Sequence, residues 1–297
     1  MLYYFTILRP LNCLMSLVAV FIGGLLVADL TTLIFTPIIY VAMIAAFLIT
    51  GAGNVINDCV DVDSDKMNAS GRPIVCGLIT GKKARNYSLL LFGIGILLTV
   101  LMANTYMFVI AVINAVLLVF YSYHLQNKIL LGNLVVSYLV GSTFLFGGAA
   151  MGNLLLPLLL MLLAMLANIA REIVKDLEDL EGDRKSFLKR LVSGVKRVVE
   201  RFELVDGKPK LKYSRRKAVI TAQISLLLAI LVSPVPYLIN LMGMSYVVLV
   251  IITDLIFIWC IYLLIKASKT KDYKRISRRI KLGMLFGLLA FIVGILF

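Results

Sequence analysis

Residues 86–127, NYSLLLFGIGILLTVLMANTYMFVIAVINAVLLVFYSYHLQN, contain no Asp, Glu, Lys or Arg. Three other stretches, residues 10–57, 129–170 and 218–265, contain at most one charged residue each. Each of these stretches is about twice as long as the ~20 apolar residues that cross a bilayer as a helix. The pattern therefore predicts a helical hairpin in each stretch, with two membrane spans joined by a short uncharged turn.

The composition of the whole chain agrees with this interpretation. Of its 297 residues, 61% are hydrophobic and only 15% are charged, which is far less charge than a soluble domain carries. Residues 282–297 predict one further span, which is short unless it begins among the basic residues before it. The apolar stretches lack the periodic polar stripe of a helix on the surface of a soluble protein. We expect an all-α membrane protein with nine transmembrane helices in a bundle, forming a single domain over residues 1–297.

The positive charges predict how these helices are oriented. With nine spans, every segment that carries Lys or Arg lies on the same side of the membrane, and the turns on the opposite side carry none. The basic segments are Arg9, residues 66–85, Lys128, residues 171–217 and residues 266–281. An excess of Lys and Arg marks the cytoplasmic side, so we expect the N-terminus inside and the C-terminus outside.

The net charge of +14 follows from the same bias, so we expect no nucleic-acid partner. A basic cytoplasmic face also suits the anionic headgroups of a bilayer and phosphorylated substrates that arrive from the cytosol. The sequence implies no protein partner.

Two acidic segments match position for position, although the chain has only 16 acidic residues. They are residues 57–66, NDCVDVDSDK, and residues 175–184, KDLEDLEGDR. Each follows an apolar helix that we expect to end on the cytoplasmic side, one near Asn57 and the other near Asp176. If the helices continue briefly, each segment places three oxygen-bearing side chains on one helical face. These residues are Asn57, Asp61 and Asp65 in the first segment and Asp176, Asp179 and Asp183 in the second.

Like charges on one helical face repel one another, which indicates that a cation normally neutralises them. Mg²⁺ fits because it prefers oxygen ligands and is commonly bound by one or two carboxylates plus substrate phosphates. Two such sites would bridge a diphosphate through metal ions and stabilise it as a leaving group. We therefore predict that these six residues bind Mg²⁺, with Asp61, Asp65, Asp179 and Asp183 as the catalytic carboxylates. The alternative is a solvated cap of charged residues at each helix end, which the matched spacing of the two segments disfavours.

The two segments also carry a family resemblance. Residues 57–65, Asn-Asp-x-x-Asp-x-x-x-Asp, followed by Gly-Arg-Pro at 71–73 and Gly-Leu-Ile at 77–79, resemble the first signature of the UbiA superfamily of intramembrane prenyltransferases. Residues 171–183, Arg-Glu-x-x-Lys-Asp-x-x-Asp-x-x-x-Asp, resemble its second signature. The resemblance covers nearly the whole chain. It implies nine helices, Mg²⁺ held between two Asp-rich motifs, and transfer of an isoprenoid from an allylic diphosphate to an acceptor.

Within the superfamily, residues 8–15, LRPLNCLM, and residues 171–179, REIVKDLED, resemble the archaeal ether-lipid branch. Members of that branch move a geranylgeranyl group from geranylgeranyl diphosphate onto the free hydroxyl of geranylgeranylglyceryl phosphate, which forms the second ether bond of the membrane lipid core. A prenyltransferase for an aromatic quinone precursor is the alternative within the superfamily. A cation or phosphate transporter is the alternative from another class. Transporters place ionisable residues near the bilayer midplane, whereas only Asp254 is expected to lie deep here.

The resemblance and the charges together indicate how substrates are bound. Arg72, Arg171 and Lys175 are expected to contact the diphosphate through charge-assisted hydrogen bonds. The isoprenoid tail requires a central, membrane-embedded cavity with a lateral opening, whose apolar and aromatic walls shelter the allylic carbocation. Arg9 and Asn12 lie at the cytoplasmic mouth of the first helix, where they would contact the acceptor or the diphosphate. A hydrogen bond between helices is the alternative for Asn12.

Residues 121–128, YSYHLQNK, depart from the Tyr-x-x-x-Lys pattern that many members carry after the fourth helix. Alignment on the following Leu-Gly-Asn places Gln126 at the usual Lys position. We expect Lys128 to reach the diphosphate instead, together with Tyr123 as a substrate contact, although Lys128 would serve equally as a cytoplasmic anchor. His124, the only histidine, is either an acid–base group or a solvated interfacial residue.

The predicted cytoplasmic segments are residues of about 58–85 and 171–217. The second includes an insert, 186–217, that begins as a basic amphipathic helix and continues through the turn signal Asp206-Gly207, which favours a short hairpin. We expect Asp254 to face the bundle interior and to pair with a Tyr, Ser or Thr side chain, or with a Lys or Arg near a helix end. A substrate role is the alternative. Together these features predict a multi-pass protein of the cell membrane whose active site faces the cytoplasm.

Overall fold

The structure, a computed structural model, describes residues 2–67, 71–126, 128–192, 202–205, 208–211 and 215–296. The chain divides into two compact units. Unit 1 comprises Met1–Gln126 and Tyr138–Met161, and unit 2 comprises Asn127–Ser137 and Leu162–Phe297. Helices α8 and α9 each contribute residues to both units.

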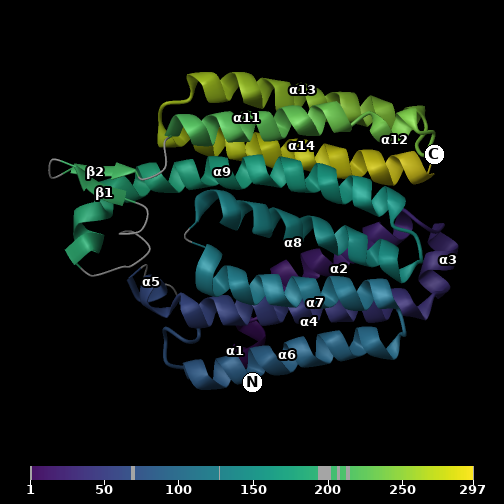
Figure 1. Cartoon of the computed structure of the whole chain (residues 1–297), viewed down its shortest axis with the longest axis horizontal. Helices are drawn as coiled ribbons and strands as arrows, with labels where there is room; N and C mark the ends of the chain where they lie inside the picture. Colours follow the sequence, from purple (N-terminus) through teal and green to yellow (C-terminus); the bar gives the residue numbers. More distant parts are fainter. Residues whose placement is uncertain are drawn as a thin grey trace. The chain divides into compact units, whose positions relative to one another are not determined.

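The elements follow one another in a nearly all-helical order (Figure 1). The first half contains α1 (Leu2–Thr6), α2 (Pro10–Leu25), α3 (Leu30–Phe35), α4 (Pro37–Val60), α5 (Val62–Met67), α6 (Gly81–Leu101), α7 (Thr105–Phe120) and a π-helical turn, η1 (Tyr121–Leu125). The second half contains α8 (Ile129–Ala150), α9 (Leu155–Val192), β1 (Phe202–Val205), β2 (Lys208–Leu211), α11 (Arg215–Val232), α12 (Val235–Leu238), α13 (Met244–Lys266) and α14 (Thr270–Leu296).

Eight helical segments in the described part of the chain are long and apolar enough to cross a membrane. They are α4, α6, α7 continued by η1, α8, α9, α11 continued by α12, α13 and α14. The remaining predicted span corresponds to α2, which has only 16 residues. Helix α14 begins at Thr270, so the last span does start among the basic residues that precede its apolar part.

Helix α9 differs most from the sequence-based expectation. We expected a helix end near Asp176, but α9 continues to Val192. The added residues include Leu, Glu, Lys and Arg, which are strong helix formers, and they include no proline. The predicted hairpin in the insert is confirmed, because β1 and β2 pair antiparallel on either side of Asp206-Gly207. The amphipathic helix predicted for the first part of the insert is helical as far as Val192, within α9, whereas Phe202, the last apolar residue of that pattern, begins β1. Residues 193–201 lie outside the described residues.

Unit 1 is held together by small residues where its helices meet. A Cβ added to Gly23 of α2 would lie 1.9 Å from the carbonyl oxygen of Phe144 on α8. A Cβ added to Gly147 of α8 would lie equally close, 1.9 Å, to the carbonyl oxygen of Val20 on α2. Glycine lets two backbones approach this closely, as at many membrane helix interfaces. Alanines and β-branched residues of α4 fill the core that α2 and α6 share with it.

Unit 2 contains a polar contact among its apolar helices. Ser233, at the end of α11, donates its hydroxyl proton to Oδ2 of Asp254 over 2.7 Å. The buried Tyr246 of α13 donates to the carbonyl oxygen of Ser233 over 2.6 Å. The expectation that Asp254 pairs with a Ser, Thr or Tyr side chain is therefore confirmed. Hydrogen bonding reduces the cost of holding a carboxylate among apolar residues.

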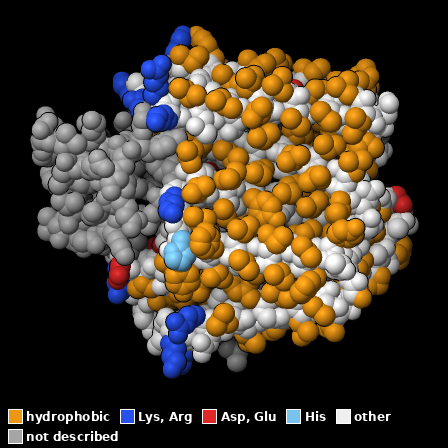
Figure 2. Space-filling model, viewed as in Figure 1, with side chains coloured by type: hydrophobic (Ala, Val, Ile, Leu, Met, Phe, Trp, Pro, Cys, Tyr) orange, Lys and Arg blue, Asp and Glu red, His pale blue; other side chains and the backbone are white. Residues whose placement is uncertain are grey.

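The surface of the helices is mostly apolar. Many large hydrophobic side chains are exposed on the long helices, among them Leu101 and Val116 of unit 1 and Trp259 and Leu231 of unit 2. Figure 2 shows hydrophobic side chains over most of the visible surface of the helices. A surface of this kind is stable against hydrocarbon rather than water, so the chain is an integral membrane protein.

Candidate active site

The first acidic motif continues the register of α4 across the break between α4 and α5. The N–H of Asp61 donates to the carbonyl oxygen of Asn57 over 2.9 Å, and the N–H of Asp65 donates to that of Asp61 over 2.8 Å. These are i to i−4 bonds, which keep the three residues at i, i+4 and i+8. Asp61 and Asp65 are both buried. The structure thus gathers the three predicted ligands of the first motif along one line of the helix.

Asp58 lies beside this line and is paired with two arginines. Its side chain is only 3% exposed, and its Oδ1 accepts from Arg9 and, over 3.0 Å, from Nη1 of Arg72. Arg72 also forms an ion pair with Asp65. A buried carboxylate needs partners of this kind, because an unpaired one is strongly disfavoured. Arg9 and Arg72, predicted as substrate contacts, therefore lie in the motif and neutralise its carboxylates in this structure.

The backbone of Arg9 is also strained. Its φ of 53° and ψ of 71° lie in the left-handed region, which is uncommon for residues other than glycine. Besides its contact with Asp58, its guanidinium lies 3.4 Å from Oδ1 of Asn57. A conformation that costs on the order of 1 kcal/mol persists only where surrounding contacts impose it. The contacts with Asn57 and Asp58 provide that constraint.

Asp65 has an altered acidity. Burial, the largest cause, raises the pKa of its carboxyl above the ordinary value. The positive charge of Arg72 opposes this shift, whereas the negative charges of Asp61 and Asp58 increase it. The raised pKa of Asp65 therefore reflects burial first and the neighbouring carboxylates second.

Gln126 joins the first motif from a distant part of the sequence. It follows η1, and its Nε2 donates to Oδ1 of Asp61 over 3.0 Å, while its Oε1 accepts from Nδ2 of Asn57 over 3.2 Å. The sequence singled out Gln126 only as a departure from a family pattern. Its role at the motif depends on the fold, and no spacing signal predicts it.

The second acidic motif lies on α9. Asp176 is half-buried and its Oδ2 accepts from Nδ2 of Asn133 on α8 over 2.9 Å, a contact that no sequence pattern predicts. Glu172 is paired with Arg171 and lies 3.7 Å from the ammonium of Lys175. The Nε of Arg171 is buried and lacks an acceptor among the described residues. Asp179 and Asp183 occupy the same continuous helix, but their side chains lie outside what the structure describes.

The structure also locates three other predicted substrate contacts. Asn12 is exposed on the first turn of α2, and Lys128 is exposed before α8. Tyr123 is 50% exposed and belongs to η1.

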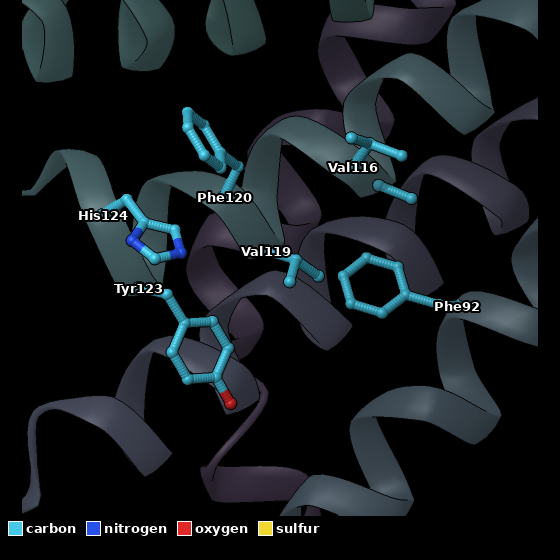
Figure 3. A pocket seen from close by; sticks show the side chains of 7 residues that line it. Phe92, Val116, Val119, Phe120, Tyr123 and His124 are labelled. Atoms are coloured by element: carbon cyan, nitrogen blue, oxygen red, sulfur yellow. The ribbon is translucent and has the colours of Figure 1, made fainter.

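Tyr123 and His124 line an apolar pocket of unit 1 with a volume of about 420 Å³. In Figure 3, Phe92 of α6 faces Val116 and Val119 of α7 across this pocket. The ring of His124 packs against that of Phe120, with centroids 5.1 Å apart. The predicted metal ligands do not line the pocket, so it contributes apolar surface rather than acidic chemistry.

The donor set of the first motif suits a hard divalent cation. Asn57, Asp61 and Asp65 offer carboxamide and carboxylate oxygens, which Mg²⁺ prefers. Among the described side chains, no three His, Cys, Asp or Glu residues converge as a complete ligand group. Mg²⁺ is commonly held by one or two carboxylates together with water and substrate phosphates, so the residues present fit this ion.

Comparisons with known proteins agree with this chemistry. A model of the UbiA prenyltransferase family matches residues 16–286. Over 294 residues the chain is 36% identical to a digeranylgeranylglyceryl phosphate synthase of Methanococcus maripaludis (strain C6), a match that covers 99% of this chain and 98% of that protein.

Solved structures also resemble this chain. A structure of a digeranylgeranylglyceryl phosphate synthase has a TM-score of 0.83 at 33% identity, covering 99% of this chain and 97% of that one. A UbiA homologue from Archaeoglobus fulgidus, solved with GPP and Mg²⁺ bound, has a TM-score of 0.64 at 15% identity, covering 98% of this chain and 100% of that one, and supports the fold alone. From the family match and the full-length relatives we conclude that the chain belongs to the UbiA prenyltransferase family.

Proposed function

We propose that this chain transfers a geranylgeranyl group from geranylgeranyl diphosphate to the free hydroxyl of geranylgeranylglyceryl phosphate, forming the second ether bond of an archaeal membrane lipid. The observation that carries the proposal is its 36% identity, over nearly the full length of both chains, to a synthase named for that product. The paired acidic motifs support it, because a diphosphate leaving group requires concentrated positive charge and therefore ligands for cations.

The proposed metal site uses both motifs. Mg²⁺ would be held by Asn57, Asp61, Asp65, Asp176, Asp179 and Asp183, and when bound it would supply positive charge to the diphosphate oxygens. The Archaeoglobus fulgidus homologue that was solved with GPP and Mg²⁺ has a related fold, which is consistent with this choice of ion. Asp61, Asp65, Asp179 and Asp183 are the proposed catalytic carboxylates.

In this proposal the arginines that pair with the first motif also bind the diphosphate. Arg9 and Arg72 are already in the motif, where they pair with Asp58 and Asp65. A cation that neutralises Asp65 would weaken its pairing with Arg72, whose guanidinium would then donate to the diphosphate. Arg171 and Lys175 would do the same at the second motif, where the buried Nε of Arg171 lacks an acceptor among the described residues. Asn12, Lys128 and Tyr123 are proposed as further substrate contacts.

The reaction breaks the allylic C1–O bond, and the diphosphate leaves with the bonding electrons. The acceptor hydroxyl oxygen then forms the new C1–O bond and loses its proton to a base, so the products are the diether, diphosphate and a proton. A central, membrane-embedded cavity with a lateral opening would hold the isoprenoid chain and exclude water from the carbocation.

The proposed membrane placement follows the positive charges. We place nine spans in one transmembrane domain of the cell membrane, with α2 as the first span, the N-terminus in the cytoplasm and the C-terminus outside. Both acidic motifs then face the cytoplasm, where phosphorylated substrates are available. The basic ends of the helices support this orientation.

The direct test is prenyl transfer by purified protein in detergent. Geranylgeranyl diphosphate and Mg²⁺ would be supplied with either geranylgeranylglyceryl phosphate or 4-hydroxybenzoate as acceptor. We expect diether from the first acceptor, its loss with EDTA, and a decrease of more than 100-fold in Asp61→Ala, since losing only a second-shell partner typically costs 10- to 100-fold. Transfer to 4-hydroxybenzoate alone would retain the metal chemistry and overturn the assigned acceptor.

A further inference from the structure

A chain of hydrogen bonds runs through the first acidic motif and ends on Asp61. Arg9 donates to Oδ1 of Asn57, Nδ2 of Asn57 donates to Oε1 of Gln126, and Nε2 of Gln126 donates to Oδ1 of Asp61. A guanidinium only donates and an ionised carboxylate only accepts, so the two ends fix the direction of every bond between them. Rotating either amide by 180° would place two donors or two acceptors against each other.

The π-helical turn η1 explains how Gln126 reaches this chain. The N–H of Gln126 donates to the carbonyl oxygen of Tyr121, five residues earlier, instead of four. The additional residue in the turn changes the direction in which the following side chain leaves the helix. Turns of this kind occur frequently at functional sites. Here the turn packs against α4, which carries Asn57 and the start of the motif.

The second motif has a matching contact within unit 2. Asn133 is 9% exposed and donates from Nδ2 to Oδ2 of Asp176 over 2.9 Å. One stretch of the sequence, residues 126–133, therefore supplies a carboxamide donor to one carboxylate of each motif. Neither donor carries a charge. A lysine in the place of either amide would hold the carboxylate equally well but would also neutralise it.

We propose that Gln126 and Asn133 are positioning residues of the two acidic motifs, each fixing one carboxylate for a divalent cation without neutralising it. The inference rests on the proposed metal-dependent function. Fixed ligands lose less conformational freedom when the ion binds, and outer-shell hydrogen bonds orient the ligand oxygens. A neutral donor orients the carboxylate without adding a positive charge of its own.

Binding of Mn²⁺ to purified protein, measured by electron paramagnetic resonance without substrate, tests the inference independently of activity. Gln126→Met keeps the length of the side chain but removes the donor, and we expect Mn²⁺ affinity to fall by 10- to 100-fold. Gln126→Lys restores a donor with a positive charge, so affinity should fall at least as far and recover partly as salt is added. Asn133→Leu should resemble Gln126→Met.

Gln223→Met is the matched control. Gln223 of α11 also donates through Nε2, over 3.1 Å to the carbonyl oxygen of Ile261, and α11 carries neither motif. We expect its Mn²⁺ affinity to equal that of the wild type. If the buried Asn133→Leu variant does not fold, the Mn²⁺ affinities of the two variants at the half-buried Gln126 still test the inference.

Two outcomes would overturn the inference: equal Mn²⁺ affinity in the wild type and Gln126→Met, and no Mn²⁺ binding by the wild type. If the first outcome came with a raised KM for geranylgeranyl diphosphate in Gln126→Met, Gln126 would be a substrate contact. Loss of Mn²⁺ affinity in the variants of a wild-type protein that transfers no prenyl group would retain the positioning role and overturn the proposed function.

Discussion

Asp58 shows how neighbouring carboxylates of one motif take different roles. It is 3% exposed and bonded to both Arg9 and Arg72, whereas Asp61 accepts from the neutral amide of Gln126. Two guanidinium partners neutralise Asp58 and hold three segments together: the start of α2, the end of α4 and the loop that carries Arg72. We therefore propose a structural role for Asp58, whereas Asp61 is one of the proposed metal ligands.

Asp58→Asn tests that assignment. The variant leaves two arginines beside a neutral amide, so we expect the protein to lose roughly 3 kcal/mol of stability, as when one partner of a buried ion pair is removed. Thermal unfolding in detergent would report this as a lower Tm. The matched control is Asp63→Asn, because the Asp63 side chain is 98% exposed and 3.9 Å from Lys66. Asp63→Asn should change the free energy of unfolding by no more than about 0.5 kcal/mol, as at other surface positions. Equal Tm values for the two variants would contradict the structural role of Asp58.

The raised pKa of Asp65 predicts a pH dependence. The folded protein holds the proton of Asp65 more tightly than the unfolded chain does. The stability that this proton contributes is therefore greatest below the pKa of Asp65 in the unfolded chain, and it is lost as the pH rises through the pKa of Asp65 in the folded protein. In EDTA, the Tm of the wild type minus the Tm of Asp65→Asn should therefore decrease as the pH rises from the unfolded-state pKa of Asp65 to its folded-state pKa. Mg²⁺ binds the ionised carboxylate, so it should oppose the decrease. A difference in Tm that is independent of pH would contradict the raised pKa of Asp65.

At the scale of elements, the contact between α2 and α8 depends on glycine. Gly147→Ala would force a Cβ to within 1.9 Å of the carbonyl oxygen of Val20 unless the two helices separate. We expect a loss of about 1–3 kcal/mol, as for other overpacked sites, visible as a lower Tm. Gly93→Ala on α6 is the control, because no atom lies within 4 Å of its added Cβ. It should be neutral or stabilise by up to about 1 kcal/mol. A Gly147→Ala variant as stable as Gly93→Ala would contradict the close approach of the two helices.

The elements also show where sequence patterns are informative. The apolar stretches predicted the long helices, because a helix in hydrocarbon must be apolar along its length. The end of α9 was predicted wrongly, since charge marks where a helix leaves the membrane but does not end it. The hairpin of β1 and β2 was predicted because the pair Asp206-Gly207 favours a tight turn between two strands, whatever the rest of the fold.

At the scale of the whole molecule, orientation in the membrane is testable with the native cysteines. Cys76 is exposed in the loop after Arg72, whereas Cys13 and Cys260 are buried and Cys59 is half-buried. An impermeant maleimide should label Cys76 in inside-out vesicles but not in intact cells. Leu238→Cys in a Cys76→Ser background places a thiol on the exposed part of α12 and should give the reverse pattern. Labelling of Cys76 in intact cells would contradict the cytoplasmic placement of the motifs.

The candidate site could be predicted only in part. The spacing of Asn57, Asp61 and Asp65 indicated a shared face, because neighbours at i+4 follow from helix geometry alone. The pairing of Arg72 with Asp65 and the bond from Gln126 to Asp61 join residues that no periodicity relates. Such contacts depend on how helices pack, so they required the structure. Family membership then removed the transporter alternative, which composition alone left open.

The identity of the product decides whether this chain forms the second ether bond. Purified protein would be given geranylgeranyl diphosphate, Mg²⁺ and equal concentrations of geranylgeranylglyceryl phosphate and 4-hydroxybenzoate, and the products would be identified by mass spectrometry. We predict the diether phosphate as the main product and its disappearance when EDTA is added. A prenylated aromatic acid as the main product, or diether that forms undiminished in EDTA, would contradict the account.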